Sequence, residues 1–137
     1  MWKYYALLSA FFAAMTAILA KVGVKGISGN VATAVRTGIV LLLAWGIVFF
    51  SGQMKEIKEL NKNNLLFLIL SGLATGLSWI FYFKALETGD VSKVAPIDKL
   101  SVVLVMIFSF VFLHETMDLK TIFGGVLIAV GAVILVL

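Results

Sequence analysis

The length and composition of the chain argue against a water-soluble domain. It has 137 residues, of which 62% are hydrophobic and 13% are charged, with a mean hydropathy of +1.12, whereas soluble domains are about half apolar and a quarter charged. The +4 net charge is scattered with no basic block, which excludes a nucleic-acid-binding chain, and the lack of Cys excludes disulfide scaffolds and thiolate metal sites.

Five apolar segments are long enough to cross the hydrocarbon core as helices, which takes about 20 residues each. The first, residues 4–24, has a secretory signal peptide as its alternative interpretation, but the apolar run is long for one. The others, in chain order, are residues 31–50, 64–86, 92–113 and 119–137. Because only short connections remain, we expect one domain over residues 1–137: an all-α, polytopic membrane protein with five transmembrane helices.

Small residues predict where these helices pack closely, because apolar side chains gain little by exchanging lipid for another apolar surface. They recur at three- and four-residue spacing in the first span, around residues 72–76 of the third, and at Gly124 and Gly125 of the fifth. Packing within one bundle and contact between subunits are both compatible with this pattern.

The loop lysines are nearly balanced between the two faces of the membrane. Five lie on the N-terminal face (Lys3, Lys55, Lys58, Lys62 and Lys120) and three on the other (Lys21, Lys25 and Lys93). The excess favours a cytoplasmic N-terminus, because positive residues concentrate on the cytoplasmic side. So small an excess is also what a chain that inserts in both orientations would show.

Four ionisable residues fall inside the predicted spans, all in the half of the membrane opposite the N-terminal face: Arg36, Lys84, Asp98 and Lys99. Charge in hydrocarbon is expensive, which makes each a candidate for substrate binding or coupling. Asp98 is expected within reach of Lys84 or Arg36, and about 100° around the helix from Lys99. The alternative is a buried ion pair that fixes helix packing, with the lysines extending to water.

Pro96 is the only proline, and it stands near the start of the fourth span. Its ring removes a hydrogen bond from a helix interior, so it marks either a helix break or a first helical turn. Broken helices often line transporter sites, and a helix that begins near Pro96 would place Asp98 in its first turn.

These motifs together resemble an EamA domain of the drug/metabolite transporter superfamily. The matching stretches are Arg36, Phe83-Lys84-Ala85-Leu86 with Gly89, Val94-Ala95-Pro96-Ile97, Leu113-His114-Glu115-Thr116, and Gly124-Gly125-Val126-Leu127-Ile128 with Gly131. The resemblance implies a single five-helix unit of the bacterial and archaeal branch, with the pathway between two units and an antiparallel homodimer. It gives Glu115 a structural role. The first span lacks the carboxylate that related small multidrug resistance proteins use, which argues against exchange of hydrophobic cations.

We therefore expect a secondary transporter of a small metabolite, an amino-acid-like or anionic solute, in the cell membrane. A small ion channel and a non-transporting membrane subunit are the alternatives, although no polar run suited to a channel filter is present. An enzyme is not expected, because the spans offer no nucleophile with a base and an orienting acid. The expected partners are the lipid bilayer, the solute and a second copy of the chain, with no cofactor, metal or nucleic acid.

Overall fold

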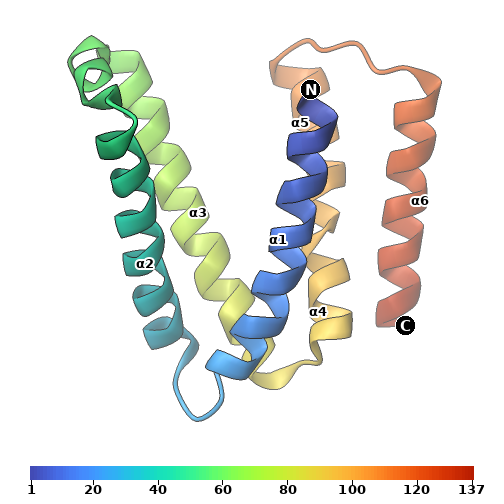
Figure 1. The fold of residues 1–137 in the computed structure, drawn as a ribbon. Coiled ribbons are helices and arrows are strands. Elements are labelled where there is room, and N and C mark those ends of the chain that lie inside the picture. Colours follow the sequence, from blue (N-terminus) through green and yellow to red (C-terminus); the bar gives the residue numbers. More distant parts are fainter. The chain divides into compact units, whose positions relative to one another are not determined.

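The computed structural model describes residues 1–137 and is helical almost throughout, with no strands. The helices are α1 (Trp2–Gly23), α2 (Gly29–Phe50), α3 (Lys62–Thr88), α4 (Val91–Asp98), α5 (Leu100–Phe112) and α6 (Leu119–Val136) (Figure 1). A short 3-10 helix, η1 (Gln53–Glu59), joins α2 to α3.

Five helical segments are long and apolar enough to cross a membrane, with α4 and α5 together (Val91–Phe112) forming the fourth. Most of their large apolar side chains are exposed and the buried residues are few. Such a surface suits lipid, because lipid tails solvate apolar side chains. Lipid cannot hydrogen-bond to backbone groups, and in a helix those groups bond to one another. The expected all-α, five-span membrane protein is confirmed, and the chain is a multi-pass membrane protein.

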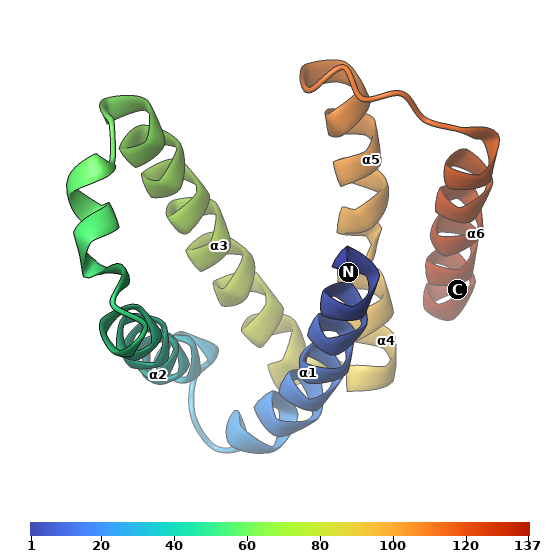
Figure 2. The ribbon, with the colours of Figure 1, turned by 45° about the horizontal axis from the view of Figure 1, so that its top comes forward.

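The helices divide into two compact units, residues 18–88 and residues 1–17 with 89–137. We call them the α2–α3 unit and the α4–α6 unit. In the α2–α3 unit, the start of α2 packs against the end of α3, and η1 links the other ends of the two helices (Figure 2). Ser28 caps α2 by accepting a hydrogen bond from the Val31 N–H, and Gly52 takes a positive φ of 73° in the turn that follows α2.

In the α4–α6 unit, both α4 and α5 pack against α6. Gly125 of α6 is buried, and a Cβ there would lie 2.6 Å from the Met106 side chain of α5. Asp118 caps α6 by accepting hydrogen bonds from the backbone N–H and the hydroxyl of Thr121. The last span therefore begins directly after a polar capping residue, Asp118, which lies outside the apolar run.

The fourth span is interrupted at Lys99, between α4 and α5. The Lys99 N–H is shared between the carbonyls of Ala95 and Pro96, at 3.3 and 3.1 Å. The Val102 N–H then donates to the Lys99 carbonyl, three residues back, at 3.0 Å. These bonds describe one tightened turn within an otherwise α-helical span. Pro96 itself lies inside α4, and Asp98 is the last residue of α4 and not part of a first turn.

Candidate functional site

Arg36 lies on the face of α2 that packs against α3. Gly29, Ala32, Thr33 and Arg36 are spaced three and four residues apart, which places them on one side of the helix. The first three are buried and Arg36 is half-buried. The helices approach closely at Gly29, where a Cβ would lie 3.1 Å from backbone atoms of α3. α2 begins at Gly29, so Arg36 stands roughly 10 Å along the helix axis, inside the span.

The guanidinium of Arg36 rests on two aromatic rings of α3. Its central carbon lies over the Trp79 ring, 4.3 Å from the centroid, and 5.5 Å from the centroid of Phe83. Trp79 and Phe83 are four residues apart, so both rings project from the same face of α3. The quadrupole of an aromatic ring attracts a cation. No carboxylate lies within salt-bridge distance of Arg36 and its guanidinium makes no hydrogen bond, so aromatic rings, and not an ion pair, lie against it.

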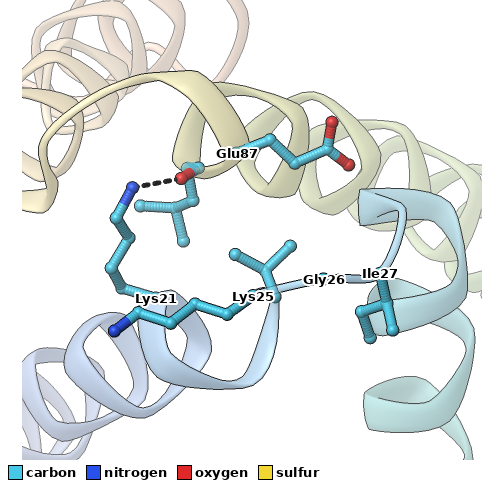
Figure 3. Close-up of a pocket in the computed structure, with 7 residues that line it drawn as sticks. Lys21, Lys25, Gly26, Ile27 and Glu87 are labelled. Atoms are coloured by element: carbon cyan, nitrogen blue, oxygen red, sulfur yellow. Dashed lines mark hydrogen bonds between the residues drawn. The ribbon is translucent and has the colours of Figure 1, made fainter.

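Three helix ends are fastened together in the α2–α3 unit. Glu87, near the end of α3, accepts a hydrogen bond from the backbone N–H of Gly29, the first residue of α2. Lys21, near the end of α1, donates to the Leu86 carbonyl at 2.5 Å (Figure 3). A carboxylate at a helix N-terminus and an ammonium at a helix C-terminus both complement the helix dipoles. These contacts therefore stabilise the junction of the three helices.

A pocket of about 340 Å³ lies beside this junction (Figure 3). The end of α1, the turn after it and the end of α3 line the pocket, with Lys21, Lys25 and Glu87 as its charged groups. Gly26, with a φ of 78°, makes the turn along its wall. Because the pocket is at the helix ends, it is a weaker candidate than Arg36 for a site within the spans.

Lys84 lies one helical turn before Thr88, on the exposed side of α3. Its ammonium makes no ion pair or hydrogen bond with the protein. Lys84 and Arg36 are thus both in the α2–α3 unit, but only Arg36 is held by neighbouring side chains.

Asp98 and Lys99 lie in the α4–α6 unit, at the interruption of the fourth span. The Lys99 ammonium is 3.4 Å from Oδ2 of Asp98, and their side chains are 56% and 36% exposed respectively. Although the two residues are neighbours in the chain, the long Lys99 side chain bends back to the carboxylate. Asp98 therefore has a partner within its own unit, and Pro96 stands just before the interruption.

The loop between α5 and α6 carries Glu115 and His114. Glu115 is exposed, and its backbone N–H donates to the Ser109 carbonyl at 3.2 Å, which closes the end of α5. His114 adopts a positive φ of 54° in this turn. No group of three or more His, Asp or Glu side chains is close enough to hold a metal ion.

The sequence reasoning missed the partners of two charged groups. It did not anticipate that Trp79 and Phe83 lie against Arg36, and it ended the third span at residue 86, before Glu87. The four-residue spacing of the two rings was a signal, since it puts them on one helix face. For Glu87 the signal was the first turn of α2, which contains no acidic residue of its own to complement the dipole.

Comparison with known proteins places the whole chain in one family. The model of the EamA-like transporter family matches residues 1–137. A Sinorhizobium protein described as an uncharacterized transporter in the cobO 3′ region is 49% identical over 134 residues, which cover 98% of this chain and 95% of that protein. No solved structure matches. The resemblance found in the sequence is therefore confirmed: this five-span chain belongs to the EamA-like transporter family.

Proposed function

We propose that the protein is a secondary transporter that moves a small metabolite across the cytoplasmic membrane, and that it is not an enzyme. Its family and its 49% identical relative, which is described as a transporter, support this function. The observation that carries the proposal is charge inside apolar spans. Arg36 and the Asp98–Lys99 pair lie in segments otherwise fit for hydrocarbon, where charged groups are costly and mark the paths of solutes and ions.

The candidate residues have different roles in this proposal. Arg36 and Lys84 bind the solute, and Asp98, with Lys99, carries the coupling proton or cation. The turn at Lys99 supports this assignment, because irregular backbone at membrane depth is tolerated where it borders a cavity or protein.

The transporter works as a homodimer, with the pathway between the two units. The 49% identical relative is matched over 95% of its length by this five-helix chain. Gly72 and Gly76 of α3 face open space, where a second copy can approach closely. The near-balance of the loop lysines supports opposite orientations for the two copies, although five lysines against three favour a cytoplasmic N-terminus.

Transport by the purified protein in lipid vesicles tests this function. Vesicles are loaded with a mixture of amino acids and organic acids, and mass spectrometry measures which solutes leave down their gradients. We expect protein-dependent movement of at least one solute, which Asp98→Asn and Arg36→Gln impair. Lys62→Gln, an exposed cation at the start of α3, is the matched control and leaves movement unchanged.

Three results would contradict the proposal. Normal transport by both Asp98→Asn and Arg36→Gln would show that neither residue binds the solute or carries the coupling ion. Ion flux far faster than a transport cycle would identify a channel. A stable complex with a different membrane protein, and no solute movement by this protein alone, would identify a non-transporting subunit.

A further inference from the structure

The two carboxylates of the membrane-spanning helices both have partners within the protein, whereas the arginine has no anionic partner. Glu87 accepts the Gly29 N–H, and Asp98 lies 3.4 Å from the Lys99 ammonium. The remaining acidic residues, Glu56, Glu59, Asp90, Glu115 and Asp118, all lie outside the five spans. Each carboxylate of the spans therefore has a hydrogen-bond or ion-pair partner, Gly29 for Glu87 and Lys99 for Asp98, whereas the Arg36 guanidinium has neither.

From this imbalance we infer that the transported solute is an organic anion and that Arg36 binds its carboxylate. The inference rests on the proposed transport function and narrows the solute class to anions. A cationic solute is not expected, because it would need a free carboxylate in the spans. A zwitterionic amino acid is not expected either, because its ammonium group would need a carboxylate and its carboxylate a cation.

The contact with Trp79 prepares Arg36 for this role. The Arg36 central carbon lies over the Trp79 ring, whose quadrupole attracts the cation without a hydrogen bond from any of its five N–H donors. Those donors match a carboxylate in a two-bond arrangement, and none of them is used within the protein. The contacts with the two rings also restrict the Arg36 side chain before the anion arrives, so less conformational entropy is lost on binding.

Arg36 stands where the packed part of the α2–α3 contact ends. Before it, Gly29, Ala32 and Thr33 are buried. One turn after it, Val40 is 39% exposed. On α3, a Cβ at Gly76 would meet nothing within 4 Å. Arg36 itself is half-buried, so it is not sealed between the helices.

A lipid headgroup could supply the same oxyanion chemistry as a solute. Arg36 is roughly 10 Å along α2, and its contact with Trp79 holds the guanidinium over α3 and away from an extended path to the membrane surface. We therefore assign the site to a solute carboxylate, and the experiment below separates the two sources.

The fluorescence of Trp79 reports directly on the site. Replacing the two other tryptophans, Trp2→Phe and Trp45→Phe, leaves Trp79 as the single emitter, and both replaced side chains are exposed. The protein is placed in phosphatidylcholine vesicles and titrated with lactate, succinate and citrate, and separately with glycine and tetraethylammonium. Uptake of the same probes is measured in parallel.

We expect at least one carboxylate to change the Trp79 emission saturably and to enter the vesicles, with no response to tetraethylammonium or glycine. Arg36→Gln should weaken carboxylate binding about ten- to a hundredfold, the range for a charged hydrogen-bonded contact. Arg36→Lys keeps the charge but loses the two-bond geometry, so it should weaken binding less, and it serves where Arg36→Gln fails to fold. Lys62→Gln should bind as the parent does.

The outcomes separate this inference from the proposed function. Uptake of tetraethylammonium or glycine without any carboxylate response would overturn the inference and leave a transporter of another class. Saturable carboxylate binding without uptake of any probe would support the site and overturn transport. A Trp79 response that requires phosphatidylglycerol in the vesicles, and no response to solutes, would make Arg36 a headgroup anchor. No response to any carboxylate would also overturn the inference.

Discussion

Gly29 lies at a close approach of α2 to α3. A Cβ there would lie 2.7 Å from Glu87 Oε1 and 3.1 Å from backbone atoms of Phe83 and Lys84. The carboxylate can move aside, but the α3 backbone can move only if the two helices separate. The same glycine donates its N–H to Glu87, so close approach and hydrogen bonding coincide at one position.

Gly29→Ala should therefore destabilise the protein by about 1–3 kcal/mol, the usual cost of overpacking. The measurement is thermal unfolding in detergent, followed by circular dichroism. Gly38→Ala is the matched control on the same helix, because a Cβ at Gly38 meets nothing within 4 Å. A greater loss of stability in Gly38→Ala than in Gly29→Ala would contradict this account of the contact.

Asp118 shows how a single exposed side chain can make stability depend on pH. Hydrogen bonds from the Thr121 hydroxyl, and secondarily from its backbone N–H, hold the pKa of the Asp118 carboxyl below its usual value. Because the folded-state pKa is depressed, the stabilisation is complete above the unfolded pKa of about 4. It is lost as the pH falls through the lower, folded-state value.

Asp118→Ala should lower the melting temperature slightly at neutral pH, and the difference from the parent should shrink in acid below about pH 4. Melting temperatures measured across this range check the prediction. Asp90→Ala is a suitable comparison, because Asp90 occupies the same cap position on α4 but its side chain makes no capping hydrogen bond. An equal, pH-independent loss in both variants would argue against capping by Asp118.

At the scale of elements, α5 and α6 pack closely where the flexible Met106 side chain lies against Gly125. A Cβ on Gly125 would lie 2.6 Å from Cε and 2.8 Å from Sδ of Met106. The neighbouring Gly124 meets nothing within 4 Å. The two adjacent glycines therefore face different surroundings, and only one belongs to the helix contact.

Gly125→Leu should destabilise the protein by about 1–3 kcal/mol, because the added side chain collides with Met106. Met106→Ala, combined with Gly125→Leu, should recover part of the loss, which makes the two sites non-additive. Thermal unfolding of the single and double variants measures the coupling. Gly124→Leu should have little effect, and strictly additive losses at Gly125 and Met106 would contradict the contact.

The spans could be predicted from the sequence because each is a run of apolar residues long enough to cross a bilayer. Their ends differ from the prediction by two residues at most: α2 begins at Gly29 and α3 runs to Thr88, because these helices continue into polar residues beyond the apolar runs. The tightened turn also falls at Lys99, after Pro96, because the backbone redistributes its hydrogen bonds over the residues that follow a proline.

The surroundings of the charged residues could be predicted only in part. Hydropathy locates Arg36 in a span but does not say that an indole ring, and not a carboxylate, lies against it. The bond between Gly29 and Glu87 joins residues far apart in the chain, and it depends on how α2 and α3 pack. Such contacts follow from helix packing, which composition alone does not specify.

At the scale of the whole molecule, the small excess of lysines on one face bears on how the chain inserts. With five loop lysines on the N-terminal face and three on the other, removing two lysines from the smaller set can decide the orientation. An antiparallel pair needs both orientations in the same membrane. The proposed dimer therefore links loop charge to activity.

Cytoplasmic and extracytoplasmic reporters fused to the C-terminus should both be active if the chain inserts in both orientations. Lys25→Gln together with Lys93→Gln leaves one lysine against five and should fix the N-terminus on the cytoplasmic side. That variant should lose transport when expressed alone. Co-expression with a chain biased the other way should restore it. One active reporter for the unaltered chain, with full transport, would contradict an antiparallel pair.

The hydrogen bonds that join Lys21 and Gly29 to the end of α3 also have a consequence for biosynthesis. The partners are separated by 65 and 58 residues in sequence, so neither bond can form until the ribosome has made nearly all of α3. Until then, the Lys21 ammonium and the Gly29 amide must remain hydrated, because unpaired polar groups are poorly tolerated in hydrocarbon. We expect the first two helices to stay shallow and mobile during translation, and to settle only when the third completes their junction.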